Sequence, residues 1–426
     1  MTLNERDKKY IWHPFTQAKT ALDPIPIVKA EGVWLIDESG NKYIDANSSW
    51  WTTIHGHGNA YINQAIKDQL DQLDHTLFAG LTHPKAVEIG ERLVNLAGGH
   101  FTKAFFSDNG STAVEVAIKT SIQYWYNQGK AKKRFLAIEG AYHGDTFGAM
   151  SVGARDVFNR PFERFFFDVD YLPFPDEQNQ AEVLRQAKDL FETGEFAGFI
   201  FEPLVQGAAG MRIYDQSILD QLIQMAKDNE VLTIADEVMT GFYRTGTLFA
   251  TDQIIAEPDF LCLSKGLSGG VLAMGMTITT ERIFEAFLDD EFARGMLHGH
   301  SFTANPITCA AACASLDLLL KSETQKKIKW LSDQHALFVQ NNIDHPSFRS
   351  VKSKGTILSI ELEVGDKGTY FSSIRDKAYE HFINNQILIR PLGNVIFVNP
   401  PYCINETELD MIYEQILDFA NTLSIG

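Results

Sequence analysis

An aspartate and a lysine each follow a short apolar run of this chain, and together they could hold a cofactor. Asp236 ends the run at residues 231–235, and Lys265 follows residues 260–263 after one serine. A lysine amine can bond covalently to a carbonyl carbon, and a carboxylate can keep a ring nitrogen protonated. The pair therefore suggests a pyridoxal-phosphate enzyme. Either residue alone is weak evidence, because charged side chains at strand ends are usually solvated.

A second chemical signal is an anion site at the start of a predicted helix. Gly110 and Ser111 follow Asn109, and apolar residues then recur at helical spacing. The free N–H groups at a helix start and the positive end of the helix dipole favour a phosphate. Serine is also a common N-cap without any ligand. The glycine-containing turn at residues 298–303 is another candidate, and spacing alone does not choose between the two.

The sequence predicts an α/β fold with a mostly parallel central sheet flanked by helices. Between about residues 101 and 268, short apolar runs alternate with longer helical stretches, a pattern typical of strands buried on both faces. Each run ends in polar or glycine-rich residues, and open α/β sheets bind ligands beyond the carboxyl ends of their strands. We therefore expect these strand-end segments to meet at one crevice. The predicted strands are residues 103–106, 135–138, 198–201, 231–235 and 260–263.

Length and pattern predict a large domain, a smaller α+β domain and an N-terminal arm. The chain has 426 residues, more than one hydrophobic core usually serves. After about residue 310 the pattern changes to a long helix and then to strands near residues 356–360 and 395–398. The expected division is 1–47 for a hairpin-bearing arm that joins the small domain, 48–309 for the large cofactor-binding domain, and 310–426 for the small domain.

Composition favours small-molecule substrates. The 37 Lys and Arg residues against 55 Asp and Glu residues give a net charge of -18, which repels nucleic acid and anionic membranes. The longest apolar stretch is too short to cross a bilayer, and the N-terminal residues lack a secretory signal. We expect a cytoplasmic protein with no nucleic-acid or membrane partner. The four cysteines are expected to be reduced core residues.

The strand-end residues resemble the signature of class III pyridoxal-phosphate aminotransferases. The matching segments are residues 234–238, 241–246, 258–259 and 264–266, within a similarity that runs from about residue 10 to residue 401. The resemblance implies a type I aminotransferase fold and a homodimer whose active sites lie at the subunit interface.

The same resemblance implies roles for individual residues. Lys265 would hold the cofactor covalently, Asp236 would pair with its ring nitrogen, and Tyr142 would stack on its ring. The implied catalytic residues are Lys265, Asp236 and Tyr142. The implied cofactor-binding residues are Gly110, Ser111, Tyr142, Asp236, Lys265 and, from across the dimer interface, Ser301 of the partner subunit.

Three further segments, residues 12–16, 48–51 and 142–148, are similar to the branch of this family that acts in biotin biosynthesis. This similarity implies amino transfer to 8-amino-7-oxononanoate, giving 7,8-diaminononanoate, with S-adenosylmethionine as the donor. A carboxylate at the end of an apolar chain suits a planar, permanently charged guanidinium, with tryptophans lining the chain. The implied substrate-binding residues are Phe15, Trp50, Trp51, Tyr142, Asp145, Gly299 and Arg390.

Several alternatives stay open. Phe15 stands where some members of the family have tyrosine, and His300 where others have proline, so lysine is an alternative donor. Within the family, the runner-up is another ω-amino-acid or diamine transaminase. A cofactor-binding protein without activity is a third reading. A metal-dependent hydrolase with His55, His57, His143, Asp145 and Asp236 as ligands is a distant alternative. His-x-His and His-x-Asp spacings occur at metal sites, but a metal site leaves Lys265 and the helix-start glycines without a role.

Overall fold

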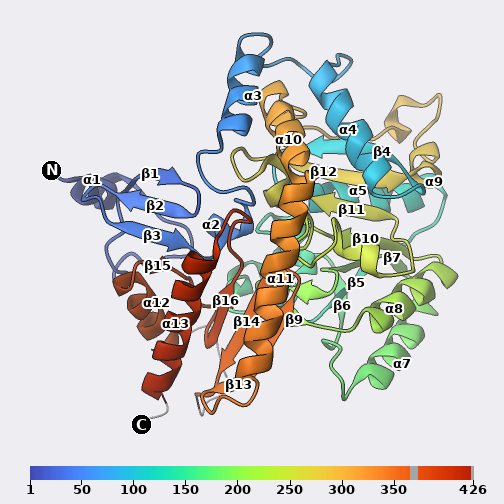
Figure 1. Cartoon of the computed structure of the whole chain (residues 1–426). Coiled ribbons are helices and arrows are strands. Elements are labelled where there is room, and N and C mark those ends of the chain that lie inside the picture. The colour runs from blue at the N-terminus through green and yellow to red at the C-terminus, as the bar shows by residue number, and fades with distance from the viewer. Residues whose placement is uncertain (365–372, 424–426) are drawn as a thin grey trace.

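The computed structural model describes residues 1–364 and 373–423, and its centre is a seven-stranded sheet (Figure 1). The strand order is β4-β12-β11-β10-β7-β5-β6. β10 runs parallel to β7 and β11, whereas β12 runs antiparallel to β11 and β4. The sheet is therefore mostly parallel, as predicted. Its strands are β4 (Phe101–Ser107), β5 (Arg134–Ile138), β6 (Val169–Leu172), β7 (Phe196–Phe201), β10 (Leu232–Asp236), β11 (Phe260–Leu263) and β12 (Gly275–Thr280).

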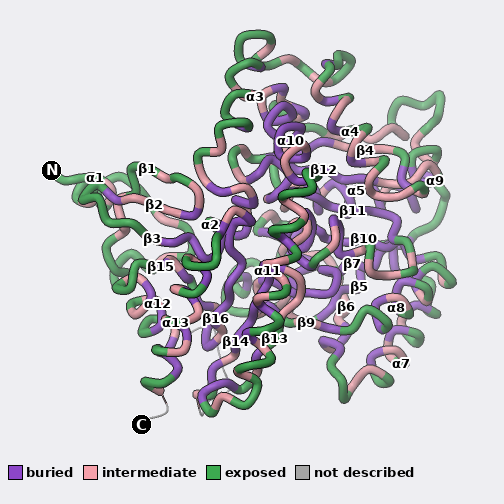
Figure 2. Tube along the Cα trace, viewed as in Figure 1, coloured by how far each residue is buried: buried purple, intermediate pink, exposed green. Residues whose placement is uncertain are grey.

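Helices cover both faces of this sheet, which explains the continuous apolar runs of its strands. On one face, α5 (Gly110–Asn127) packs through Val114 and Ile118 against β10, β11 and β12. On the other face lie α7 (Gln180–Phe191) and α8 (Gln216–Asp228). All six residues of β7 are buried, and Figure 2 shows the central strands enclosed between the helical layers. A strand covered on both sides shows no alternation of polar and apolar residues.

The N-terminal arm and the C-terminal region share a second sheet. β2 (Trp34–Asp37) and β3 (Lys42–Asp45) form the predicted hairpin. β1 (Ile27–Glu31) pairs antiparallel with β2, and β15 (Ile387–Leu388) pairs in parallel with β3. Three antiparallel strands form a third sheet beside it. These are β13 (Phe348–Lys354), β14 (Ile357–Leu362) and β16 (Val395–Val398), accompanied by α11 (Ser322–Asn342), α12 (Ser373–Asn384) and α13 (Glu406–Leu423).

The expected long helix after residue 310 is instead two helices. α10 (Pro306–Leu319) packs against α3 (Ala60–Leu70) and α4 (Pro84–Leu96) of the large domain, and α11 packs against β13 and β14. Residue 310 lies inside α10, so we propose that the domains join between α10 and α11. The other short elements are α1 (Leu3–Tyr10), α2 (Ser48–Trp51), α6 (Phe147–Val152), α9 (Glu281–Glu285), β8 (Val205–Gln206), β9 (Arg212–Ile213) and the 3₁₀ turns η1 (Arg160–Phe165), η2 (Ala250–Gln253), η3 (Lys265–Ser268) and η4 (Phe292–Arg294).

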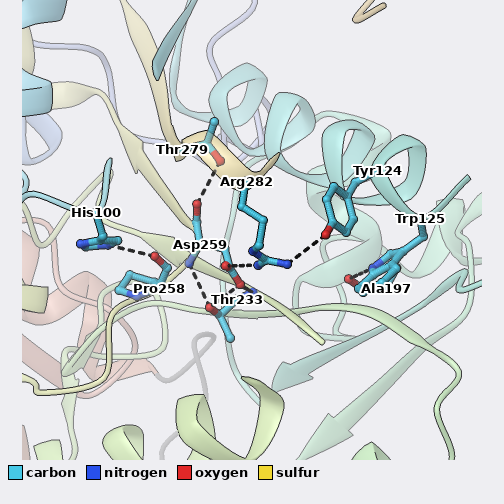
Figure 3. A network of polar contacts seen from close by, with 9 residues as sticks. All are labelled: His100, Tyr124, Trp125, Ala197, Thr233, Pro258, Asp259, Thr279 and Arg282. Atoms are coloured by element: carbon cyan, nitrogen blue, oxygen red, sulfur yellow. Dashed lines mark hydrogen bonds and ion pairs between the residues drawn. The ribbon is translucent and has the colours of Figure 1, made fainter. Parts of the chain in front are cut away.

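Asp259 ties the amino ends of the central strands together (Figure 3). Its carboxylate accepts hydrogen bonds from the Thr233 N–H (2.9 Å) and hydroxyl (3.1 Å) and lies 2.6 Å from Arg282 Nη2. Arg282 also donates to the hydroxyl of Tyr124 on α5. This part of the sequence signature is therefore structural, since it stands at the sheet edge opposite the strand-end segments. Within the described residues, we find no helix with the length and hydropathy required to span a bilayer.

Candidate active site

The carboxyl ends of β10 and β11 open into a pocket of about 400 Å³. All five strand-end segments contribute to its lining, which is the convergence expected from a parallel sheet. Its lining includes Gly110, Ser111, Tyr142, His143, Glu202, Asp236 and Lys265.

Lys265 enters the pocket from a strained position. Its φ is 43°, in the left-handed region that non-glycine residues rarely adopt. Burial lowers the pKa of Lys265 to about 8, although the neighbouring carboxylates of Asp236 and Glu202 raise it. The Nζ atom lies 4.7 Å from the centre of the Trp51 ring. A partly desolvated lysine of this kind is suited to nucleophilic and proton-transfer chemistry.

Asp236 is buried and held by two partners. Its Oδ2 lies 2.6 Å from His143 Nδ1, and its Oδ1 accepts a hydrogen bond from the Val238 N–H at 3.1 Å. The other ring nitrogen of His143 is buried without a partner among the described residues. Both contacts fix the direction in which the carboxylate points into the pocket.

The start of α5, the candidate anion site, lies in the same pocket. Asn109 caps the helix by accepting from the Thr112 N–H, and the first N–H groups of a helix have no carbonyl partner within it. Gly144 packs so closely on this turn that a Cβ there would lie 1.9 Å from Ser111 Oγ. A Cβ at Gly110 would lie 2.6 Å from Val238 Cγ1. The two glycines therefore allow the backbone to approach a bound anion closely.

Tyr142 and Glu202 form a second hydrogen-bonded group beside Asp236. The Tyr142 hydroxyl donates to Asp145 Oδ2 at 2.8 Å, and burial together with this carboxylate raises the pKa of the tyrosine. Glu202 accepts from the N–H groups of Tyr142 (3.0 Å) and Gly207 (2.9 Å). Burial raises the pKa of Glu202 to about 7. The carboxylate of Glu202 thus holds the backbone of the tyrosine segment.

A group of aromatic residues and one arginine comes from the arm, the start of the large domain and the small domain. The Arg390 guanidinium lies 5.3 Å from the Trp50 ring and donates to the Phe15 carbonyl at 3.3 Å. The Phe15 and Trp50 rings meet edge to face at 5.5 Å. Trp51 lines the pocket directly. Gly299 and Ser301 belong to the exposed segment before α10 and do not line the pocket of this chain.

Sequence reasoning assigned no role to Glu202 or Arg244, and it placed His143 only in the hydrolase alternative. Arg244 is 1% exposed and donates to Asn399 Oδ1 (2.7 Å) and to the carbonyls of Pro400 (3.1 Å) and Trp51 (3.3 Å). It therefore joins the large domain to the small one beside the pocket. The position of Arg244 in the signature at residues 241–246 was the one sequence feature that pointed to it. No spacing rule identifies its hydrogen-bond partners, which are distant in the sequence.

The five residues of the alternative metal site do not gather in one place, although His143 contacts Asp236. His55 Nε2 lies 3.1 Å from Ser315 Oγ, and His57 Nε2 lies 2.9 Å from Asp45 Oδ2. Over residues 1–364 and 373–423, no group of three or more His, Cys, Asp and Glu side chains is arranged to hold a metal ion.

The chain is similar over nearly its whole length to known aminotransferases. The family model described as Aminotransferase class-III matches residues 16–419. A Synechococcus elongatus protein named adenosylmethionine-8-amino-7-oxononanoate aminotransferase is 43% identical over 97% of this chain and 99% of its own length. A Helicobacter pylori protein of the same name is 35% identical, covering 99% of this chain and 98% of the relative.

Two solved structures share the fold. The crystal structure of adenosylmethionine-8-amino-7-oxononanoate aminotransferase from Methanocaldococcus jannaschii has a TM-score of 0.91 at 36% identity, with 98% of each chain covered. A pyridoxal-phosphate-bound amine transaminase from an uncultivated Pseudomonas species has a TM-score of 0.90 at 28% identity. That match covers 96% of this chain and 98% of the transaminase.

Proposed function

The chain belongs to the class-III aminotransferases, as a pyridoxal-phosphate enzyme of the type I fold, and we propose that its acceptor substrate is 8-amino-7-oxononanoate. The product would be 7,8-diaminononanoate, a step of biotin biosynthesis, and the amino donor S-adenosylmethionine. The names of the relatives from Synechococcus, Helicobacter and Methanocaldococcus support this proposal.

The residues of the pocket fit pyridoxal phosphate. Lys265 would hold its carbonyl carbon, Asp236 would face its ring nitrogen, and the N–H groups of Gly110 and Ser111 would bind its phosphate. The close packing of Gly144 on Ser111 leaves the start of α5 accessible to that phosphate. When bound, the cofactor supplies an electrophilic carbon and a ring that accepts electrons.

Lys265 is the group that moves protons. A pKa of about 8 leaves roughly one Lys265 amine in ten neutral at pH 7, whereas an ordinary lysine is almost fully protonated. The neutral Nζ can take the proton from the substrate carbon. His143 and the Val238 N–H hold Asp236 in place during this step. The Trp51 ring lies against the Lys265 amine on one side.

The single observation that carries the substrate proposal is the group formed by Phe15, Trp50 and Arg390. Two aromatic rings next to a guanidinium suit a substrate with an apolar chain and a terminal carboxylate. The fork of the guanidinium can donate two parallel hydrogen bonds to that carboxylate.

We also propose a cytoplasmic homodimer that acts on small molecules and not on nucleic acid. Trp12 is 91% exposed and Tyr10 is 70% exposed in one chain, so a second copy would cover apolar surface next to Phe15. Ser301, which does not line the pocket of its own chain, would complete the site of the other subunit. Sedimentation analysis of the purified protein tests the dimer.

The test of the proposed function uses the purified holoenzyme and its cofactor absorbance. Adding S-adenosylmethionine should convert the cofactor to its amino form, and adding 8-amino-7-oxononanoate should reverse the change. Conversion by lysine but not by S-adenosylmethionine would show that the donor assignment is wrong. Turnover of ω-amino acids or diamines without turnover of the keto acid would favour the related transaminase instead.

A further inference from the structure

Four consecutive residues, two of them the tryptophans of the proposed substrate site, adopt a left-handed turn. The φ angles of Ser48, Ser49, Trp50 and Trp51, which form α2, are 49°, 45°, 74° and 69°. None of the four is glycine, and L-amino acids avoid this conformation because Cβ then approaches the next carbonyl oxygen. A run of this kind persists only where the surrounding structure holds it.

The carboxylate of Asp45 binds Ser49 of the turn. Asp45 is fully buried at the end of β3, and its Oδ1 accepts from the Ser49 N–H at 2.9 Å. Its Oδ2 accepts from the Ser49 hydroxyl at 2.7 Å and lies 2.9 Å from His57 Nε2. His57 is itself fixed by two backbone hydrogen bonds with Gly32. Hydrogen bonds to an ionised acceptor are stronger than neutral ones, so this carboxylate is suited to stabilising a strained turn.

Asn47, which precedes the turn, and Ser48, its first residue, are joined to the C-terminal segment that carries Arg390. Asn47 Oδ1 accepts from the Arg390 N–H at 2.7 Å, and Asn47 Nδ2 donates to the Phe397 carbonyl at 2.9 Å. The Ser48 hydroxyl donates to the Asn399 carbonyl at 2.8 Å. One short segment therefore positions both tryptophans and the backbone of the arginine.

We propose that Asp45 and Asn47 are positioning residues that set the spacing between the tryptophan rings and Arg390, and so select the length of the substrate chain. This inference rests on the proposed function, since it takes the substrate to be a keto acid with a terminal carboxylate. Neither residue lines the pocket. They act through Trp50, Trp51 and Arg390.

The main test is Asp45→Asn, with Asp37→Asn as the matched control. Asp37 is also a buried aspartate of the same sheet, and it accepts from the Ser39 and Asn41 N–H groups in the β2–β3 hairpin, away from the turn. Asp45→Asn should raise the KM for 8-amino-7-oxononanoate about tenfold while kcat changes less than threefold. It should also alter the near-ultraviolet circular dichroism of the tryptophans and narrow the preference between keto acids of different chain length. Asp37→Asn should lower the melting temperature and leave these readouts unchanged.

Two further variants cover a failure of Asp45→Asn to fold. His57→Ala should raise the same KM by about threefold, and His57→Gln, which can still donate to Asp45, should restore it. Adding Ser49→Gly to Asp45→Asn should bring the raised KM part of the way back to the wild-type value, because glycine adopts the left-handed conformation without penalty.

A wild-type KM and tryptophan spectrum in Asp45→Asn would overturn the inference, as would an equal rise of KM in Asp37→Asn. A wild-type enzyme that does not turn over the keto acid would instead refute the proposed function. In that case the tryptophan spectrum of Asp45→Asn still tests whether Asp45 positions the turn.

Discussion

Replacing Gly144 with alanine is expected to weaken the binding of pyridoxal phosphate by at least about fivefold. Gly144 has a φ of +123°, and a Cβ there would lie 1.9 Å from Ser111 Oγ, 2.6 Å from Ser111 Cβ and 2.9 Å from Ser111 Cα. The new methyl group therefore has to push the start of α5 away, and this start is the proposed phosphate site.

The magnitude follows from two costs. A left-handed backbone costs a non-glycine residue about 1–2 kcal/mol. An extra methyl group in a packed site costs about 1–3 kcal/mol. The backbone cost is paid with or without the cofactor and lowers stability, whereas the displacement of Ser111 lowers affinity, and 1 kcal/mol corresponds to a factor of about 5 in a dissociation constant. The clash falls on Ser111, so the loss should appear in cofactor affinity.

The assay is a titration of the cofactor-free protein with pyridoxal phosphate, followed by absorbance, with thermal unfolding measured in parallel. Gly194→Ala is the matched control, because Gly194 also has a positive φ (+73°) but a Cβ there meets nothing within 4 Å. This control should lose some stability and keep its affinity for the cofactor. Affinity within threefold of wild type in Gly144→Ala would refute the assignment of the phosphate to Gly110 and Ser111.

Three further predictions concern other parts of the molecule. Folding lowers the pKa of Lys265 from 10.5 to about 8, so between these pH values the unfolded chain binds more protons and the cofactor-free protein should gain stability as pH rises. Lys265→Met should lose this gain in melting curves recorded from pH 7 to 10.5. An unchanged pH dependence in this variant would contradict the prediction. Arg390→Lys should raise the KM for the keto acid by about 10- to 100-fold, because an ammonium cannot donate two parallel hydrogen bonds to one carboxylate; steady-state kinetics with equal cofactor loading would show it, and a wild-type KM would remove Arg390 from the substrate site. Asp259→Asn should lower the free energy of unfolding by about 1–3 kcal/mol, measured with denaturant, because it weakens the contacts with Thr233 and Arg282. The affinity for the cofactor should not change. A large loss of that affinity would mean that the amino edge of the sheet has a role beyond stability.

The central strands were predictable where they are buried on both faces. β7 and β10 are continuous apolar runs, so their pattern alone identified them. β6 and β12 were missed because β6 carries an aspartate and a tyrosine and β12 is rich in threonine. The break between α10 and α11 was also missed, since only the packing of α10 on α3 separates the two helices in space.

The candidate site also contains residues that could be predicted from the sequence and contacts that could not. Gly110, Asp236 and Lys265 stand at the ends of predicted strands or at a helix start, and parallel strands bring their carboxyl ends to one edge. The contact between His143 and Asp236 depends on side-chain direction, and that between Arg244 and Asn399 joins segments more than 150 residues apart along the chain.

The sequence by itself determined the chemistry of this protein, because a lysine and a carboxylate at neighbouring strand ends depend on local pattern and on the topology of a parallel sheet. Only the tertiary structure decided how a substrate could be held. Trp50 and Arg390 meet because β15 pairs with β3 and because Asp45 and Asn47 hold a left-handed turn between them. Local preference opposes that turn, so only contacts between segments distant in the sequence can produce it.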